Sequence, residues 1–151
     1  MTGDASTSAG PASLTIRLGF HHPTMDPELI TTRLRLRPTR QVRAGDQVIG
    51  IDGLKRRNVE PDTRWTLSKQ YYDFSPDEES PDVSSRLRTF LDPLMREPSF
   101  VRQLALEGTA WIELNFPGQF HLGCVIHPDV LRIIADLDME LGLEVFPDSA
   151  T

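Results

Sequence analysis

Two segments of this chain alternate apolar and polar residues, and this alternation limits the folds that the chain can adopt. Residues 14–20 read LTIRLGF, and residues 110–116 read AWIELNF. A period of two places the apolar side chains on one face of a β-strand and the polar side chains on the other. Residues 63–71 follow the same pattern around Trp65 and Leu67. A sheet with one apolar face needs a layer of helices to cover it.

Apolar residues at helical spacing predict that layer. Four helices are expected, over residues 26–34, 83–94, 98–107 and 128–137. Asp26 followed by Pro27 predicts a capped start for the first helix, and Gly108 predicts the end of the third.

Further strands complete the pattern. Residues 120–126 also alternate and follow a Pro-Gly turn, so we expect them to pair as a hairpin with residues 110–116. Residues 139–145 predict a closing strand, and residues 48–51 allow a short one. The predicted order is β-α-(β)-β-α-α-β-β-α-β. This order indicates an α+β fold with an antiparallel or mixed sheet and helices packed mainly on one face.

The length of 151 residues suits a single domain with one core. We place this domain at residues 13–147. Residues 1–12 are small and polar and predict a flexible N-terminal tail, and residues 148–151 predict a short C-terminal one. Residues 1–12 also lack the basic start and the apolar stretch of a secretory signal.

Charge and composition exclude several classes of partner. The formal net charge of −6 argues against binding of nucleic acid. No run approaches the roughly 20 apolar residues of a membrane-spanning helix, so we expect no membrane partner either. The single cysteine, Cys124, excludes an internal disulfide and suits a reducing compartment. We therefore expect a cytoplasmic protein.

Several short motifs occur in an order that is informative about the family. They are LRLRPT at 34–39, GD at 45–46, RWTLS at 64–68, PDVL at 128–131 and LEVF at 143–146. This set resembles the bacterial domain-of-unknown-function family 4279 (DUF4279) over about residues 13–147. The resemblance implies the family's fold and a single domain, and it transfers no activity and no catalytic residue. Arg35 and Asp138 stand where it leads us to expect glycine.

The residues that could hold a metal or act as a nucleophile diverge in the predicted strands. His121 and Cys124 are three residues apart and therefore point to opposite faces, and the adjacent His21 and His22 also point apart. Zinc requires three or four donors that converge on one point. We expect Cys124 to face the core, and we predict no catalytic residue, no metal and no cofactor.

The irregular segment at residues 38–62 carries one set of candidate binding residues. They are Arg40, Arg43, Asp46 and Arg56. Long irregular loops often carry function, and arginine side chains clamp carboxylates and phosphates.

Aromatic and acidic residues on the strands form the second set. If the strands that carry them are neighbours, Trp111, Glu113 and Glu144 would share the face away from the helices, together with Phe146. An ordinary solvated outer face is the alternative interpretation. Trp65 is either a core anchor or part of a binding surface, and the face that it shares with an apolar neighbour favours the core.

The leading hypothesis is a non-catalytic protein-interaction module. It rests on charge segregation, with basic residues concentrated between residues 33 and 57 and acidic residues at 77–82. A small immunity-type protein that neutralises a toxin is one form of this hypothesis. The alternative is a small anionic-ligand-binding module, or an enzyme, with its site at residues 38–62. The chain would act as a monomer, or as a homodimer that pairs through exposed sheet edges.

Overall fold

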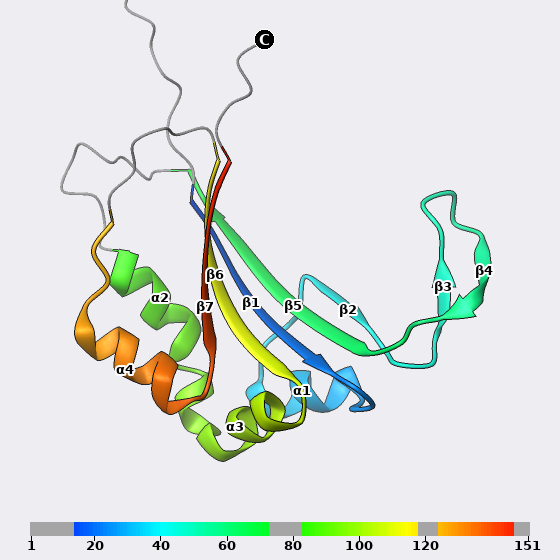
Figure 1. Ribbon diagram of the computed structural model, residues 1–151, viewed down its shortest axis with the longest axis horizontal. Helices are drawn as coiled ribbons and strands as arrows, with labels where there is room; N and C mark the ends of the chain where they lie inside the picture. The colour runs from blue at the N-terminus through cyan, green and yellow to red at the C-terminus, as the bar shows by residue number, and fades with distance from the viewer. Residues whose placement is uncertain (1–13, 73–82, 118–123, 147–151) are drawn as a thin grey trace, which may run out of the picture.

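A helical layer covers one face of a twisted sheet, and a two-stranded arm projects from it (Figure 1). The computed structural model describes residues 14–72, 83–117 and 124–146, so the predicted tails at 1–12 and 148–151 lie outside the described residues. The main sheet has the order β2-β5-β1-β6-β7, with bounds β1 Leu14–His22, β2 Arg40–Val42, β5 Thr63–Tyr71, β6 Thr109–Pro117 and β7 Glu140–Phe146. The arm consists of β3 Gln47–Ile49 and β4 Lys55–Val59.

The helical layer lies on a single face of the main sheet (Figure 1). Its members are α1 Pro27–Leu34, α2 Val83–Leu91, α3 Pro98–Glu107, α4 Pro128–Asp136 and a short 3-10 helix at Leu94–Arg96. α1 packs on β5, α3 on β1 and β6, and α4 on β7. None of these helices is long and apolar enough to cross a membrane.

The main sheet is mixed. β2, β5, β1 and β6 pair antiparallel, and β7 joins β6 as a parallel neighbour. A parallel neighbour requires a crossover connection, and α4 lies in that connection here. The predicted α+β class with helices on one face is therefore confirmed.

Alternation correctly indicates which side of each long strand is buried. Leu14, Ile16, Leu18 and Phe20 on β1 are fully buried, as is Ile112 on β6. Burying a large apolar side chain of this kind contributes about 1.5–3 kcal/mol. The inner face of β1 and its neighbours is thus the main source of stability, and it orients the opposite face towards solvent.

The predicted hairpin between residues 110–116 and 120–126 is wrong. One edge of β6 is occupied by β1 and the other by β7. Residues 124–127 are not in a strand, and residues 118–123 lie outside the described residues. Alternation indicates that a segment is a half-buried strand, but it does not indicate which strand lies beside it.

Residues 38–62 are more regular than their sequence indicates. β2 extends the main sheet, and β3 and β4 form the separate arm. The weak strand signal at 48–51 overlaps β3, which ends at Ile49. Every residue of β4 is exposed, so no apolar pattern marks it.

Two positions where the resemblance leads us to expect glycine have the backbone conformation that glycine favours. The φ angle is 55° at both Arg35 and Asp138. Arg35 is the residue that ends α1. A left-handed conformation costs a residue with a Cβ about 1–2 kcal/mol. Both turns therefore form in this chain without the glycine that the resemblance leads us to expect.

A buried histidine ties the end of β1 to α3. Nδ1 of His22 accepts the backbone N–H groups of Thr24 at 3.0 Å and Met25 at 2.8 Å. Because Nδ1 accepts, Nε2 carries the proton and donates to Oε2 of Glu107 at 2.7 Å. This hydrogen bond lowers the pKa of Glu107 below its usual 4.5, and a second hydrogen bond from Gln103 acts in the same direction.

The Glu107 carboxylate should make a contribution to the stability of the fold that is lost at acid pH. A carboxyl group whose pKa is lowered in the folded state stabilises the fold above its unfolded pKa, near 4.5, and this contribution is lost as the pH falls through the folded pKa. Glu107→Gln should therefore lower the Tm at about pH 7, and the difference from the wild type should shrink towards about pH 3. Thermal unfolding followed by circular dichroism measures this difference.

The matched control is Glu140→Gln, because Glu140 is exposed on β7. Its Tm should follow that of the wild type across the range. A difference for Glu107→Gln that stays constant down to about pH 3 would contradict the assigned role of the carboxylate.

Candidate functional site

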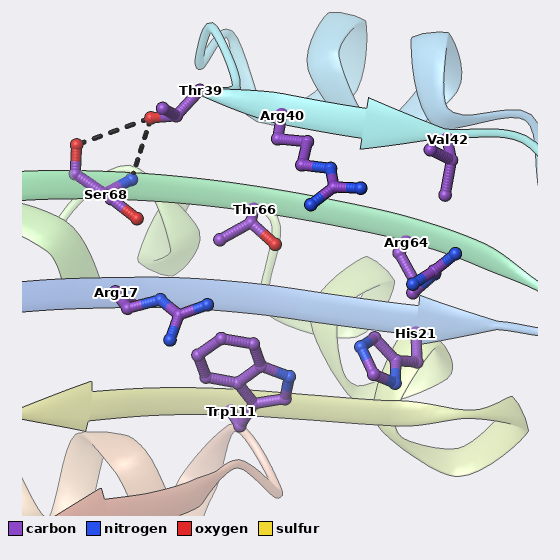
Figure 2. A pocket seen from close by; sticks show the side chains of 9 residues that line it. All are labelled: Arg17, His21, Thr39, Arg40, Val42, Arg64, Thr66, Ser68 and Trp111. Carbon is purple, nitrogen blue, oxygen red and sulfur yellow. Dashed lines mark hydrogen bonds between the residues drawn. The ribbon is translucent and has the colours of Figure 1, made fainter. Parts of the chain in front are cut away.

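The face of the main sheet away from the helices is hollowed into an open cavity of about 390 Å³. Side chains from β1, β2, β5 and β6 and from the residue before β2 surround it (Figure 2). These side chains belong to Arg17, His21, Thr39, Arg40, Val42, Arg64, Thr66, Ser68 and Trp111. They alternate with the core residues of the same strands, which is why they face solvent together.

A missing side chain makes room for one wall of the cavity. Gly19 on β1 lies opposite Thr66 on β5 and opposite Trp111 on β6. A Cβ atom at Gly19 would lie 2.1 Å from Cζ2 of Trp111, so the indole occupies the space that a larger residue would fill. Glycine inside a strand often marks such a close approach. The indole can therefore lie across β1.

Two side chains of β1 flank the Trp111 indole (Figure 2). Cζ of Arg17 lies 5.6 Å from the ring centroid, within the range of a cation–π interaction. The His21 ring meets the indole edge to face, with the ring centroids 6.4 Å apart. Arg17, Gly19 and His21 are spaced by two residues and share one face, so a single strand positions the indole.

Carboxylates neutralise two of the three arginines in the cavity. Nη1 of Arg17 donates to Oε1 of Glu113 at 3.2 Å. Arg64 pairs with Glu60 and lies 3.5 Å from Asp62, measured from Nε to Oδ1.

Arg40 keeps its charge uncompensated. Its guanidinium forms no hydrogen bond or ion pair with any residue in the described part of the chain. Figure 2 shows it reaching from β2 over β5, on the side where Thr66 and Trp111 lie. Thr39 holds this end of β2 in place, because its Oγ1 accepts the Ser68 N–H at 2.9 Å and donates to the Ser68 carbonyl at 3.4 Å.

The groups in the cavity suit binding of a small anion. The cavity offers one uncompensated guanidinium, one aromatic wall and several hydroxyl groups. These are the features of a site for an anionic group on a planar or apolar body.

Some residues selected from the sequence lie at this cavity. Arg40 and Trp111 line it, and Glu113 pairs with an arginine of the lining. Because β6 and β7 are neighbours, Trp111, Glu113 and Glu144 share the face away from the helices. The side chain of Phe146 lies outside the described part of the structure.

The four residues selected in segment 38–62 do not come together, because β2 and the arm separate them. Arg43 pairs with Asp26, the residue that caps α1, at 2.8 Å. Arg56 pairs with Asp52 inside the arm at 3.0 Å. Asp46 lies at the base of the arm, in a turn where its backbone N–H donates to the Arg43 carbonyl.

Trp65 belongs to the core and not to a binding surface. It is completely buried, and its ring lies 5.6 Å from the Phe20 ring between centroids. Its Nε1–H donates to the Thr31 hydroxyl of α1 at 3.0 Å. The core interpretation, which the sequence favoured, is therefore correct.

Among the residues that the sequence analysis did not select for a binding site are Arg17, His21 and Arg64 of the cavity lining, and Gly19, on which the indole lies. All four occupy the outward positions of the alternating pattern on β1 and β5. The glycine inside the β1 pattern was a usable signal, because it indicates a close approach by another group. The others could be found only once β5, β1 and β6 were known to be neighbours.

The described residues contain no group of three or more His, Cys, Asp or Glu side chains that could hold a metal ion. His121, a candidate ligand in the sequence, lies outside them. Cys124 precedes α4 and is not on a strand, and it packs partly buried against the core. Burial raises the pKa of the Cys124 thiol, which disfavours the thiolate that nucleophilic attack requires.

Comparison with known proteins gives a family but no characterised relative. The family model described as "Domain of unknown function (DUF4279)" matches residues 11–146. No curated protein and no solved structure matches this chain.

A methyl group at position 19 should displace the Trp111 indole from β1. Gly19→Ala should cost about 1–3 kcal/mol through overpacking, measured by urea unfolding. It should also increase the quenching of tryptophan fluorescence by acrylamide, because the displaced Trp111 becomes more exposed. Trp65 is fully buried, so it contributes little to the quenching. Gly142→Ala on β7 is the control, because its Cβ would lie at an ordinary 3.4 Å from Cγ of Glu113. Unchanged quenching in Gly19→Ala would show that the indole does not lie on β1.

Proposed function

Since this chain belongs to the DUF4279 family, whose description assigns no activity, we propose its function from its own geometry. It is a non-catalytic module that binds an anionic group in the cavity of the open sheet face. The observation that carries this proposal is the guanidinium of Arg40, which has no partner among the described residues and lies in the same cavity as Trp111. Arginine binds carboxylates and phosphates with two parallel hydrogen bonds.

The rigidity of the site supports the same function. Most of the lining side chains come from paired strands whose register is set by the buried inner face. Sites on such elements hold their geometry better than sites on loops. The volume of about 390 Å³ also lies within the usual range of small-molecule sites, about 300–1,000 Å³.

Removing the unpaired guanidinium should abolish most of the affinity. Metabolite carboxylates and phosphates are screened by thermal shift, and each hit is then measured by isothermal titration calorimetry. Arg40→Ala should weaken binding of a hit by about tenfold or more, because a hydrogen bond to a charged group contributes about 1.5–3 kcal/mol.

Arg43→Ala is the matched control, because Arg43 lies three residues further along the chain and pairs with Asp26 outside the cavity. It should leave the affinity within about twofold of the wild type. The proposal fails if no anion binds, or if every hit binds Arg40→Ala as tightly as the wild type.

Protein interaction is a second function, favoured by the arm of β3 and β4. Four large apolar side chains on the arm are exposed, namely Ile49, Ile51, Leu54 and Val59. A ribbon of two strands is only marginally stable by itself. Exposed apolar residues on such a ribbon are therefore typical of a surface that a partner covers.

The charge of the arm indicates the kind of partner. Lys55 and Arg57 are exposed on β4 and form no ion pair with other described residues. They are a local excess of positive charge on a chain of net charge −6. An acidic protein with an apolar patch would be complementary, as an immunity-type protein would need for its toxin. The single Cys124 supports a reducing compartment such as the cytoplasm for this interaction.

A charged residue at the end of the arm should prevent such binding. Wild type, Ile51→Asp and the control Leu106→Asp are compared as baits in a lysate of the source cells. Leu106 is similarly exposed, at 87%, but lies on α3. A partner recovered in equal amounts by wild type and Leu106→Asp, and lost with Ile51→Asp, is the expected result. Recovery of no stoichiometric partner, or equal recovery by all three baits, would contradict an interaction through the arm.

A further inference from the structure

We infer that the cavity selects a singly charged carboxylate on a planar, apolar body. This inference rests on the anion-binding function proposed above and adds the class of ligand. The two parts of such a ligand correspond to two sides of the cavity, with Arg40 reaching in from β2 and Trp111 from β6 (Figure 2).

The balance of charge in the cavity sets the charge of the ligand. Of its three arginines, only Arg40 has no carboxylate partner among the described residues. Arg17 donates from Nη1 to Glu113, whose side chain is 16% exposed, so the positive charge of Arg17 is already compensated. A dianion would therefore place its second charge near Glu113 with no free cation to receive it.

The side chain of Trp111 sets the shape of the ligand. Its indole is half-buried on Gly19, so part of its surface remains open to the cavity. Val42 adds an apolar group beside Arg64 on the β2 side. Aromatic rings pack favourably with their centroids about 4.5–7 Å apart, in offset or edge-to-face geometry. A ligand with one ring can pack on the indole while its carboxylate reaches Arg40.

Glu113 is therefore the residue that determines specificity between ligands of different charge. It acts through Arg17, whose positive charge it neutralises at 3.2 Å. Glu113→Gln keeps an oxygen that can accept the Arg17 hydrogen bond but removes the negative charge. The cavity would then hold two uncompensated guanidinium groups, which suits a dianion.

Calorimetric titration at neutral pH and low salt tests this selection with three probes: benzoate, acetate and phenyl phosphate. Phenyl phosphate is mostly a dianion at this pH. The wild type should bind benzoate about tenfold more tightly than acetate, which lacks the ring, and than phenyl phosphate, which carries the additional charge. Glu113→Gln should raise the affinity for phenyl phosphate about tenfold and change that for benzoate less than about threefold.

Glu97→Gln is the matched control for charge. It frees Arg33 of α1 from an ion pair of 2.6 Å outside the cavity, and it should leave all three affinities unchanged. An equal gain for phenyl phosphate in Glu97→Gln would assign the effect to net charge and overturn the role of Glu113.

The remaining outcomes distinguish failure of the proposed ligand class from failure of the proposed anion-binding function. Phenyl phosphate bound by the wild type as tightly as benzoate, with both lost in Arg40→Ala, would overturn the ligand class and leave the anion site in place. Binding of some other anion that depends on Arg40, with none of the three probes bound, would do the same. Failure of every anion to bind would overturn the anion-binding function itself.

Discussion

The central strand β1 has neighbours on both edges and a different environment on each face, and the rest of the structure depends on this arrangement. Its inner side chains, from Leu14 to Phe20, are buried beneath the helices. Its outer residues Arg17, Gly19 and His21 build the cavity. A shift of register by one residue would exchange the two sets, so burial of the inner face also fixes the geometry of the outer one.

The candidate site follows from this division of the sheet. A mostly antiparallel sheet can leave one face in water, and here that face carries arginines, hydroxyl groups and one tryptophan. The cavity exists because Gly19 lets Trp111 lie across the strand. Its charge is limited because carboxylates neutralise Arg17 and Arg64. The resulting site has one uncompensated guanidinium beside an aromatic wall, and these two features together favour binding of a small anion.

Much of the fold could be predicted from local patterns, and the exceptions have physical causes. The expected strand at 63–71 and helix at 98–107 match β5 and α3, because both have a buried face that leaves a period in the sequence. The arm at 47–59 has no fully buried residue, so β4 has no apolar period and β3 has only the weak strand signal at 48–51. The hairpin at 110–126 was expected because residues 120–126 alternate and follow a Pro-Gly turn, but β7 occupies that edge of β6.

Local periodicity was sufficient to place Trp65 in the core and Trp111 on the opposite face, because the direction of a side chain depends only on its position along its own strand. It could not place Arg40 in one cavity with Trp111. These residues lie on β2 and β6, with β5 and β1 between them, and they meet only through three strand pairings. Pairing between distant segments decides strand order and register, and no short window of residues contains that information.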